Sequence, residues 1–177
     1  MGRIRIGEAA PGFDLPSVDG KKYSLDTFRD KAVVVVMFTT NHCPYVQAYE
    51  DRLIAIRKDY ASRGVALVAI NSNEDKNYPE DSFENMITRA KNKGFNFPYL
   101  RDATQSVARS YGAQYTPEIF VFDKDRRLVY HGRIDGDWKE PVKGGGRDLR
   151  EALDAALEGR LPPKPETQAF GCTIKWA

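Results

Sequence analysis

Residues 33–46 read VVVVMFTTNHCPYV and hold the junction around which the other elements can be arranged. The run from Val33 to Phe38 is continuously apolar and rich in β-branched residues, which is typical of a central strand buried on both faces. Pro44 suits the first position of a helix, where its missing N–H is not needed. The stretch therefore predicts a buried strand that leads into a helix, with Cys43 between them.

The predicted helix leads to a second buried strand. Apolar side chains recur at helical spacing between residues 46 and 60, Gly64 ends the pattern, and residues 65–70 form the next apolar run. Strand–helix–strand units of this kind are nearly always parallel and right-handed. We therefore expect residues 33–38 and 65–70 to form neighbouring parallel strands.

The flanking regions supply further elements. Residues 7–30 predict a β-hairpin around the turn Asp19-Gly20. The glycine-rich stretch 144–146 lacks the Gly-Lys-Ser/Thr ending of a phosphate loop, and we expect a surface loop there. The second half of the chain otherwise predicts a helix around residues 83–90, a short strand over 95–100, a small helix capped by Asp102 or Thr104, strands over 119–122 and 128–131, a helix over 149–157 and a proline-rich tail.

These elements predict one α/β domain with a central mixed sheet flanked by helices. A chain of 177 residues suits a single domain. We divide residues 1–177 into an N-terminal hairpin extension (1–30), a core (31–159) and an extended, docked C-terminal tail (160–177). A parallel strand–helix–strand half followed by a strand–strand–helix half is the layout of the thioredoxin fold.

The composition narrows the classes of function. The 27 Lys and Arg nearly balance the 25 Asp and Glu, and no basic run alternates with aromatics, so we expect no nucleic-acid partner. The longest apolar run, residues 32–38, is far too short to cross a membrane, and the N-terminus has no apolar stretch like that of a signal peptide. We therefore expect a cytoplasmic protein that acts away from membranes. Two cysteines are too few for a secreted disulfide framework.

Cys43 is the first candidate for chemistry. Unpaired N–H groups and the helix dipole favour negative charge at a helix N-terminus, so the thiolate, which is the nucleophilic form, should be stabilised there. Its neighbours Asn41, His42 and Pro44 are not core residue types, and the C-terminal edge of parallel strands is where ligands bind. The alternative is a buried cysteine that only fills the core. We predict a reactive Cys43.

Four segments carry a family pattern. They are GEAAPGFDL (7–15), NHCPYV (41–46), Thr116-Pro117 and GCTIKW (171–176). Together they resemble the thioredoxin superfamily, and most closely its peroxiredoxin-like branch with a single-cysteine site, related to alkyl hydroperoxide reductase and thiol-specific antioxidant proteins. The resemblance implies a cis Pro117 beside the active cysteine. It also implies an antioxidant oxidoreductase without a cofactor, whose substrate site includes Asn41, Pro44, Thr116 and Pro117.

The site departs from both patterns of that superfamily. A thioredoxin has Cys-x-x-Cys, but residues 43–46 read CPYV, so no dithiol can form within the motif. The peroxiredoxin pattern Thr-x-x-Cys is met by Thr40 and Cys43. However, Val36 stands where the upstream proline belongs, and residues 116–118 (TPE) stand near the place expected for an arginine. Without a cation to polarise the peroxide O–O bond, peroxide attack would be slow.

Cys172 is the candidate resolving cysteine. A reactive cysteine without a neighbouring thiol often depends on a second thiol elsewhere to break its mixed disulfide. The alternative is that Cys172 only packs a C-terminal extension. Ile174 and Trp176 are apolar and could anchor that extension to the domain.

Other polar residues lie near the predicted sheet edge. His42 could raise the thiolate content of Cys43 by pairing with it, join both cysteines as a metal ligand, or shape the rim of the pocket; we expect no metal site. Asn71 and Asn73 follow the second parallel strand, where their amides could bind a substrate backbone or cap the next segment. His131 on the predicted hairpin is expected to be structural.

Three hypotheses of function follow. The leading one is a thiol-disulfide oxidoreductase in which Cys43 attacks a disulfide or oxidised-thiol protein, and Cys172 or an external thiol reductant resolves the adduct. The second is a peroxiredoxin-like thiol peroxidase that passes through a Cys43 sulfenic acid. The third is a non-catalytic redox-sensing or binding module. The residues leave a homodimer open.

Overall fold

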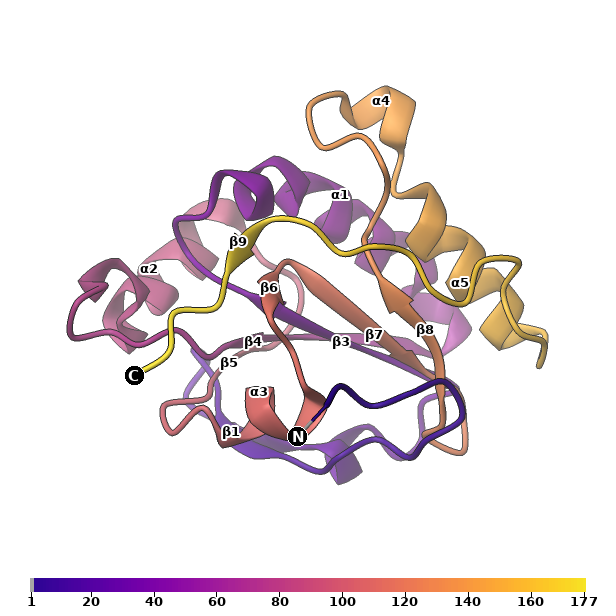
Figure 1. Ribbon diagram of the computed structural model, residues 1–177, viewed down its shortest axis with the longest axis horizontal. Coiled ribbons are helices and arrows are strands. Elements are labelled where there is room, and N and C mark those ends of the chain that lie inside the picture. Colours follow the sequence, from indigo (N-terminus) through magenta and orange to yellow (C-terminus); the bar gives the residue numbers. More distant parts are fainter. Residues whose placement is uncertain (1) are drawn as a thin grey trace.

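A five-stranded sheet forms the centre of the protein in the computed structural model, which describes residues 2–177 (Figure 1). The strand order is β5-β4-β3-β7-β8. β3 (Val33–Thr39) lies in the middle, parallel to β4 (Val65–Asn71) and antiparallel to β7 (Glu118–Phe122). β5 (Tyr99–Arg101) continues the parallel half, and β8 (Leu128–Gly132) continues the antiparallel half. This is the mixed α/β architecture that the order of elements predicts.

β3 is buried along its whole length, as its run of valines predicts. Its alternating side chains enter two separate hydrophobic clusters because successive strand residues point to opposite faces. One cluster includes residues of α1 (Pro44–Tyr60), α2 (Phe83–Lys93) and α5 (Arg147–Leu157). The other includes residues of α3 (Ser106–Tyr111) and the segment that carries the hairpin of β1 (Asp14–Pro16) and β2 (Lys22–Ser24). The helices therefore cover both faces of the sheet (Figure 1).

Short elements connect these layers. They are the 3-10 turns Leu25–Phe28, Ala61–Arg63 and η3 (Pro79–Asp81), the strands β6 (Tyr115–Thr116) and β9 (Cys172–Thr173), and the helix α4 (Pro141–Gly144). Within residues 2–177, no helix combines the length and the apolar character needed to cross a bilayer.

Two local expectations are corrected, and the expected cap of the small helix is confirmed. The strand predicted from residue 95 begins only at Tyr99. Asp102 caps α3 by accepting the N–H groups of Val107 and Ala108, and the Thr104 hydroxyl accepts the N–H of Ser106. The glycine-rich stretch is not a surface loop, because Gly146 is buried at the start of α5 and a side chain there would come within 2.6 Å of a core isoleucine.

The tail returns across the domain and docks on it, as expected (Figure 1). The N–H of His131 donates to Pro165 O (3.0 Å), and that of Ile174 donates to Gln114 O (2.9 Å). Ile174 is buried, so its predicted role as an anchor is confirmed. Trp176 is 41% exposed and lies under the Arg109 guanidinium, so it contributes less.

Candidate active site

The junction between β3 and α1 places Cys43 at the N-terminus of the helix, as the sequence predicts. Cys43 is the N-cap residue of α1, and Pro44 occupies the first helical position. Cys43 is only 1% exposed, and its thiol faces the Thr116 carbonyl oxygen at 3.6 Å. The thiol therefore lies at the helix N-terminus, where it faces a carbonyl oxygen, but beneath a cover.

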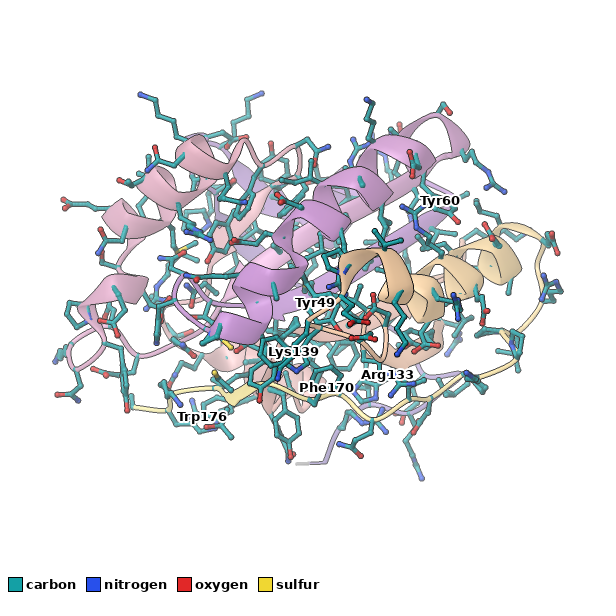
Figure 2. All side chains as sticks on the ribbon, turned by 90° about the horizontal axis from the view of Figure 1, so that it is seen from above. Tyr49, Tyr60, Arg133, Lys139, Phe170 and Trp176 are labelled. Atoms are coloured by element: carbon teal, nitrogen blue, oxygen red, sulfur yellow. The ribbon has the colours of Figure 1, made fainter. Side chains whose placement is uncertain are left out.

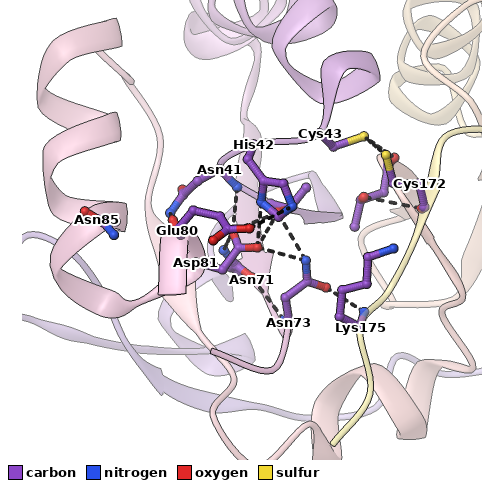
Figure 3. A network of polar contacts seen from close by, with 12 residues as sticks. Asn41, His42, Cys43, Asn71, Asn73, Glu80, Asp81, Asn85, Cys172 and Lys175 are labelled. Atoms are coloured by element: carbon purple, nitrogen blue, oxygen red, sulfur yellow. Dashed lines mark hydrogen bonds and ion pairs between the residues drawn. The ribbon is translucent and has the colours of Figure 1, made fainter. Parts of the chain in front are cut away.

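That cover carries the second cysteine. Cys172 Sγ lies 2.7 Å from Cys43 Sγ, and both cysteines are free thiols (Figure 3). A disulfide bond is about 2.05 Å long, so a shift of well under 1 Å would bring the two sulfurs to bonding distance. The structure thus brings together two residues that are separated by 129 positions in the chain.

Strand pairing explains how Cys172 reaches this place. β9 pairs antiparallel with β6, with Cys172 opposite Thr116. The Thr116 hydroxyl also contacts Cys172 O at 3.4 Å. Gly171 is required just before β9, because its φ is +150° and a Cβ there would overlap the Thr116 carbonyl oxygen. The peptide bond from Thr116 to Pro117 is cis. Thr116 therefore contacts both cysteines.

The two thiols differ in their surroundings. Burial, followed by the hydrogen bond and the charge of Cys43, raises the pKa of Cys172 to about 11, while Lys175 acts in the opposite direction. The Cys172 thiol therefore stays protonated at neutral pH as long as Cys43 beside it is free.

An aromatic surface borders the cysteine pair. Tyr45, in the first turn of α1, packs on Trp138 with ring centroids 4.6 Å apart and on Phe170 of the tail at 5.8 Å. Tyr49 lies one turn further along α1 and also faces Phe170 (Figure 2). The tail is therefore held next to the start of α1 by aromatic contacts as well as by β9.

A buried carboxylate, which the sequence analysis missed, lies at the centre of the neighbouring polar network (Figure 3). Asp81 of η3 is fully buried and accepts hydrogen bonds from Thr40 Oγ1, Asn41 N, Asn71 Nδ2 and Asn73 Nδ2 at 2.7–3.0 Å. Burial acts to raise the pKa of Asp81, but these hydrogen bonds outweigh it, so the pKa is lowered. Asp81 is therefore an ionised acceptor of hydrogen bonds from two loops. The sequence around Asp81 has no periodic pattern that would have pointed to this role.

This network shows what Thr40 and His42 contact, and it excludes the pairing of His42 with Cys43 among the roles left open. The Thr40 hydroxyl donates to both oxygens of Asp81 rather than to the Cys43 sulfur. His42 does not pair with Cys43, because its Nδ1 lies 2.9 Å from Asp81 Oδ2 and its Nε2 lies 3.6 Å from Glu80. No group of three or more His, Cys, Asp and Glu side chains in residues 2–177 is arranged to hold a metal ion.

Of the two roles left open for Asn71 and Asn73, the structure shows the capping role, because Asn71 Oδ1 accepts the Asn73 N–H at 3.0 Å. The Asn71 and Asn73 amides are buried and donate to Asp81, so neither NH₂ group is available to a substrate. Asn41 is buried as well, donating to Glu80 O and accepting from the Tyr99 hydroxyl. These side chains were expected at the sheet edge, and they lie there, but they support the loop instead of facing a substrate.

A buried hydrogen bond between a carboxylate and an imidazole occupies the place expected for a peroxiredoxin arginine. Glu118 follows Pro117, and one of its carboxylate oxygens lies 2.6 Å from His131 Nε2. Its other oxygen accepts the N–H groups of Gln114 and Tyr115. Both side chains therefore stabilise the segment around β6, and the expected structural role of His131 is confirmed.

Comparison with known proteins assigns the family. Residues 6–131 match the AhpC/TSA family, which is more than half of the chain. The chain belongs to the AhpC/TSA family. The part matched to the AhpC/TSA family contains Cys43 and Pro117, whereas Cys172 lies beyond it.

Individual relatives agree with this assignment. The crystal structure of a hypothetical protein SMc02350 from Sinorhizobium meliloti 1021 is 41% identical with a TM-score of 0.94, and the match covers 99% of this chain and 97% of that one. Thiol-disulfide oxidoreductase ResA from Geobacillus thermodenitrificans is 28% identical over 71% of this chain and 67% of its own length. Peroxidoxin BcpB from Mycobacterium tuberculosis shares the thioredoxin fold, with 20% identity, a TM-score of 0.66, and coverage of 84% and 97%.

Proposed function

We propose that the protein is a thiol-disulfide oxidoreductase in which Cys43 is the nucleophile and Cys172 the resolving thiol. The observation that carries the proposal is the 2.7 Å separation of the two sulfurs at the N-terminus of α1. A cysteine that only filled the core would not need a second thiol docked against it by a dedicated strand pair. The similarity to ResA, which is named a thiol-disulfide oxidoreductase, supports the same chemistry.

The first step is attack on the substrate. The Cys43 thiolate attacks one sulfur of a protein disulfide, a new S–S bond forms, and the other substrate sulfur leaves as a thiolate that takes a proton from water. The attack takes place at the N-terminus of α1, where Cys43 is the N-cap residue. Because Cys43 is buried, the substrate reaches it only after β9 separates from β6.

The second step is resolution by the tail. Once Cys43 is bound to the substrate it no longer carries a charge or a thiol proton, so two of the causes that raise the pKa of Cys172 disappear. Cys172 then loses its proton more readily and attacks Cys43 Sγ. The bond from Cys43 to the substrate breaks, the substrate leaves as a thiolate, and a Cys43–Cys172 disulfide remains. An external thiol reductant restores both thiols.

The partners implied are a disulfide or oxidised-thiol protein and a thiol reductant. Thr116 and Pro117 are proposed to line the substrate site, since Thr116 contacts both cysteines. Pro44 is exposed at the first position of α1 and is proposed to form its rim. The cytoplasmic location, the antioxidant role and the homodimer stay predictions.

Mass mapping and a turnover assay test the proposal together. After mild oxidation with diamide, we expect peptides of Cys43 and Cys172 to be joined by a disulfide, and we expect the reduced protein to reduce insulin. Cys43→Ser should abolish insulin reduction, whereas Cys172→Ser should accumulate a mixed disulfide on Cys43. Unchanged insulin reduction by Cys43→Ser would refute the proposal.

A thiol peroxidase is the second candidate, favoured by the AhpC/TSA match. It requires peroxide to oxidise Cys43 to a sulfenic acid, which Cys172 would condense with to release water. Glu118, hydrogen-bonded to His131, stands in the place expected for an arginine. The Thr40 hydroxyl is bound to Asp81, so it is not directed at a peroxide beside Cys43. Rapid peroxide consumption with a trapped sulfenic acid would favour this candidate. Disulfide formation without turnover would instead favour the redox-sensing module.

A further inference from the structure

The Asp81 carboxylate connects the two segments that carry the cysteines. It belongs to η3, between β4 and α2, and is distant in sequence from both Cys43 and Cys172. Its two oxygens receive hydrogen bonds from opposite sides of the site, and its burial leaves the charge dependent on those bonds. A substitution at Asp81 therefore weakens or removes the hydrogen bonds of every group bonded to it.

One set of contacts holds the loop that leads into Cys43. The Asn41 N–H donates to Asp81 Oδ1 at 2.8 Å, and the Thr40 hydroxyl donates to both oxygens. His42, next to Cys43, places Nδ1 2.9 Å from Asp81 Oδ2. The residues before Cys43 are thus fixed to one carboxylate, and with them the direction in which the helix N-terminus presents the thiol.

A second set of contacts holds the tail that carries Cys172. Asn73 Nδ2 donates to Asp81 Oδ2 at 3.0 Å, and this bond orients the amide so that Asn73 Oδ1 accepts the N–H of Lys175 at 2.9 Å (Figure 3). The Lys175 carbonyl in turn accepts from Glu74 N and Gln105 Nε2, both at 2.8 Å. Lys175 is three residues from Cys172, so the tail is fixed to the same carboxylate as the loop before Cys43.

We propose that Asp81 is a positioning residue that sets the approach of the Cys43 and Cys172 sulfurs. This inference rests on the proposed function, in which the two sulfurs form a bond with each other. Asp81 binds the loop before Cys43 directly and the tail that carries Cys172 through Asn73. It therefore determines how often the two sulfurs come within bonding distance of each other. In physical terms it raises the effective concentration of Cys172 at Cys43.

The first test replaces the carboxylate with an amide of the same size. In Asp81→Asn, an NH₂ donor faces the hydroxyl and amide donors of the network, so at least one hydrogen bond is lost. We would equilibrate the full-length protein in glutathione buffers of defined redox ratio and measure the fraction of Cys43–Cys172 disulfide by mass. We expect the effective concentration of the thiol pair to fall about tenfold.

Asp135→Asn is the matched control. Asp135 is also a buried carboxylate with a lowered pKa, satisfied by the Tyr49 hydroxyl and the Arg52 guanidinium, but its side chain makes no hydrogen bond to the loop before Cys43 or to the tail. We expect Asp135→Asn to lower thermal stability without changing the thiol equilibrium. An Asp81→Asn protein that is destabilised but has the wild-type equilibrium would overturn the positioning role.

A pair of asparagine variants keeps the test decisive if Asp81→Asn does not fold. Asn73→Ala and Asn71→Ala each remove one donor to Asp81, but only Asn73 also binds the tail. We expect Asn73→Ala to lower the effective concentration about fivefold and Asn71→Ala to change it much less. Equal effects would refute the proposal. If the wild-type protein forms no Cys43–Cys172 disulfide in any buffer, the proposed function itself fails, which is a different outcome.

Discussion

Gly171 offers a way to open the site without touching either sulfur. Its φ of +150° and the overlap of any Cβ with the Thr116 carbonyl oxygen make Gly171→Ala incompatible with the β6–β9 pair. We estimate a cost of about 2 kcal/mol for the strain and the overlap. Only two residue pairs join β6 to β9, so separation of this pair relieves the cost more easily than unfolding does.

The expected magnitude follows from that cost. A destabilisation of about 2 kcal/mol increases the population with β9 detached about 30-fold. Cys43 is 1% exposed when β9 is docked, so its labelling reports the detached state. In a Cys172→Ser background, where Cys43 is the single thiol, we expect iodoacetamide to label Gly171→Ala about 30-fold faster at a fixed pH, as followed by mass spectrometry.

Gly159→Ala provides the control. Gly159 also has a positive φ, of +72°, but no atom lies within 4 Å of a Cβ built there. Gly159→Ala should suffer the backbone strain alone, at the end of α5 and outside the β6–β9 pair, and leave Cys43 labelling at the rate of the parent. If Gly171→Ala labels at the parent rate, β9 is not what covers Cys43. If both variants label equally fast, the opening is general and not local to β9.

Two further predictions concern charge. The rate of Cys172 alkylation should rise as the pH approaches the pKa of about 11. In Cys43→Ser the rise should come at lower pH, because the hydrogen bond and charge of Cys43 are gone. An unchanged pH profile of labelling would contradict this. Asp135→Asn should destabilise the protein by about 3 kcal/mol at pH 7 because it leaves Arg52 buried without its partner charge. Because the pKa of Asp135 is lowered in the folded state, its contribution to the free energy of unfolding is present above about pH 4 and is lost as the pH falls through the folded-state pKa. In urea unfolding, the difference between Asp135→Asn and wild type should therefore be smaller at pH 3 than at pH 7.

Sequence periodicity was sufficient for the central elements. The valine run of β3 and the apolar spacing of α1 reflect burial. Buried positions require apolar residues, so burial can be read from the local sequence. The position of Cys43 follows directly, since it lies between a strand and a helix that are each recognisable. Prediction was weaker where a segment is short or fixed by distant contacts, as with β5 and with Gly146. The glycine at 146 is explained by its φ of +69° and by the approach of Ile56 from α1.

The polar residues show the same limit. Asn71 and Asn73 were placed correctly at the edge of the sheet, yet their partner Asp81 comes from another loop and carries no pattern of its own. An amide that follows a strand can bind a substrate or a buried carboxylate, and only the fold selects between them. For the same reason Thr40 matched a peroxiredoxin motif while its hydroxyl is engaged elsewhere.

The sequence by itself determined that a cysteine stands at the N-terminus of a helix after a buried strand, because these are properties of neighbouring residues. Only the tertiary structure decided that Cys172 is its partner, at 2.7 Å. That contact depends on a strand pair and a docked tail that close a loop of more than a hundred residues. Such closure is a property of the whole chain, since no local propensity specifies where a distant segment will return.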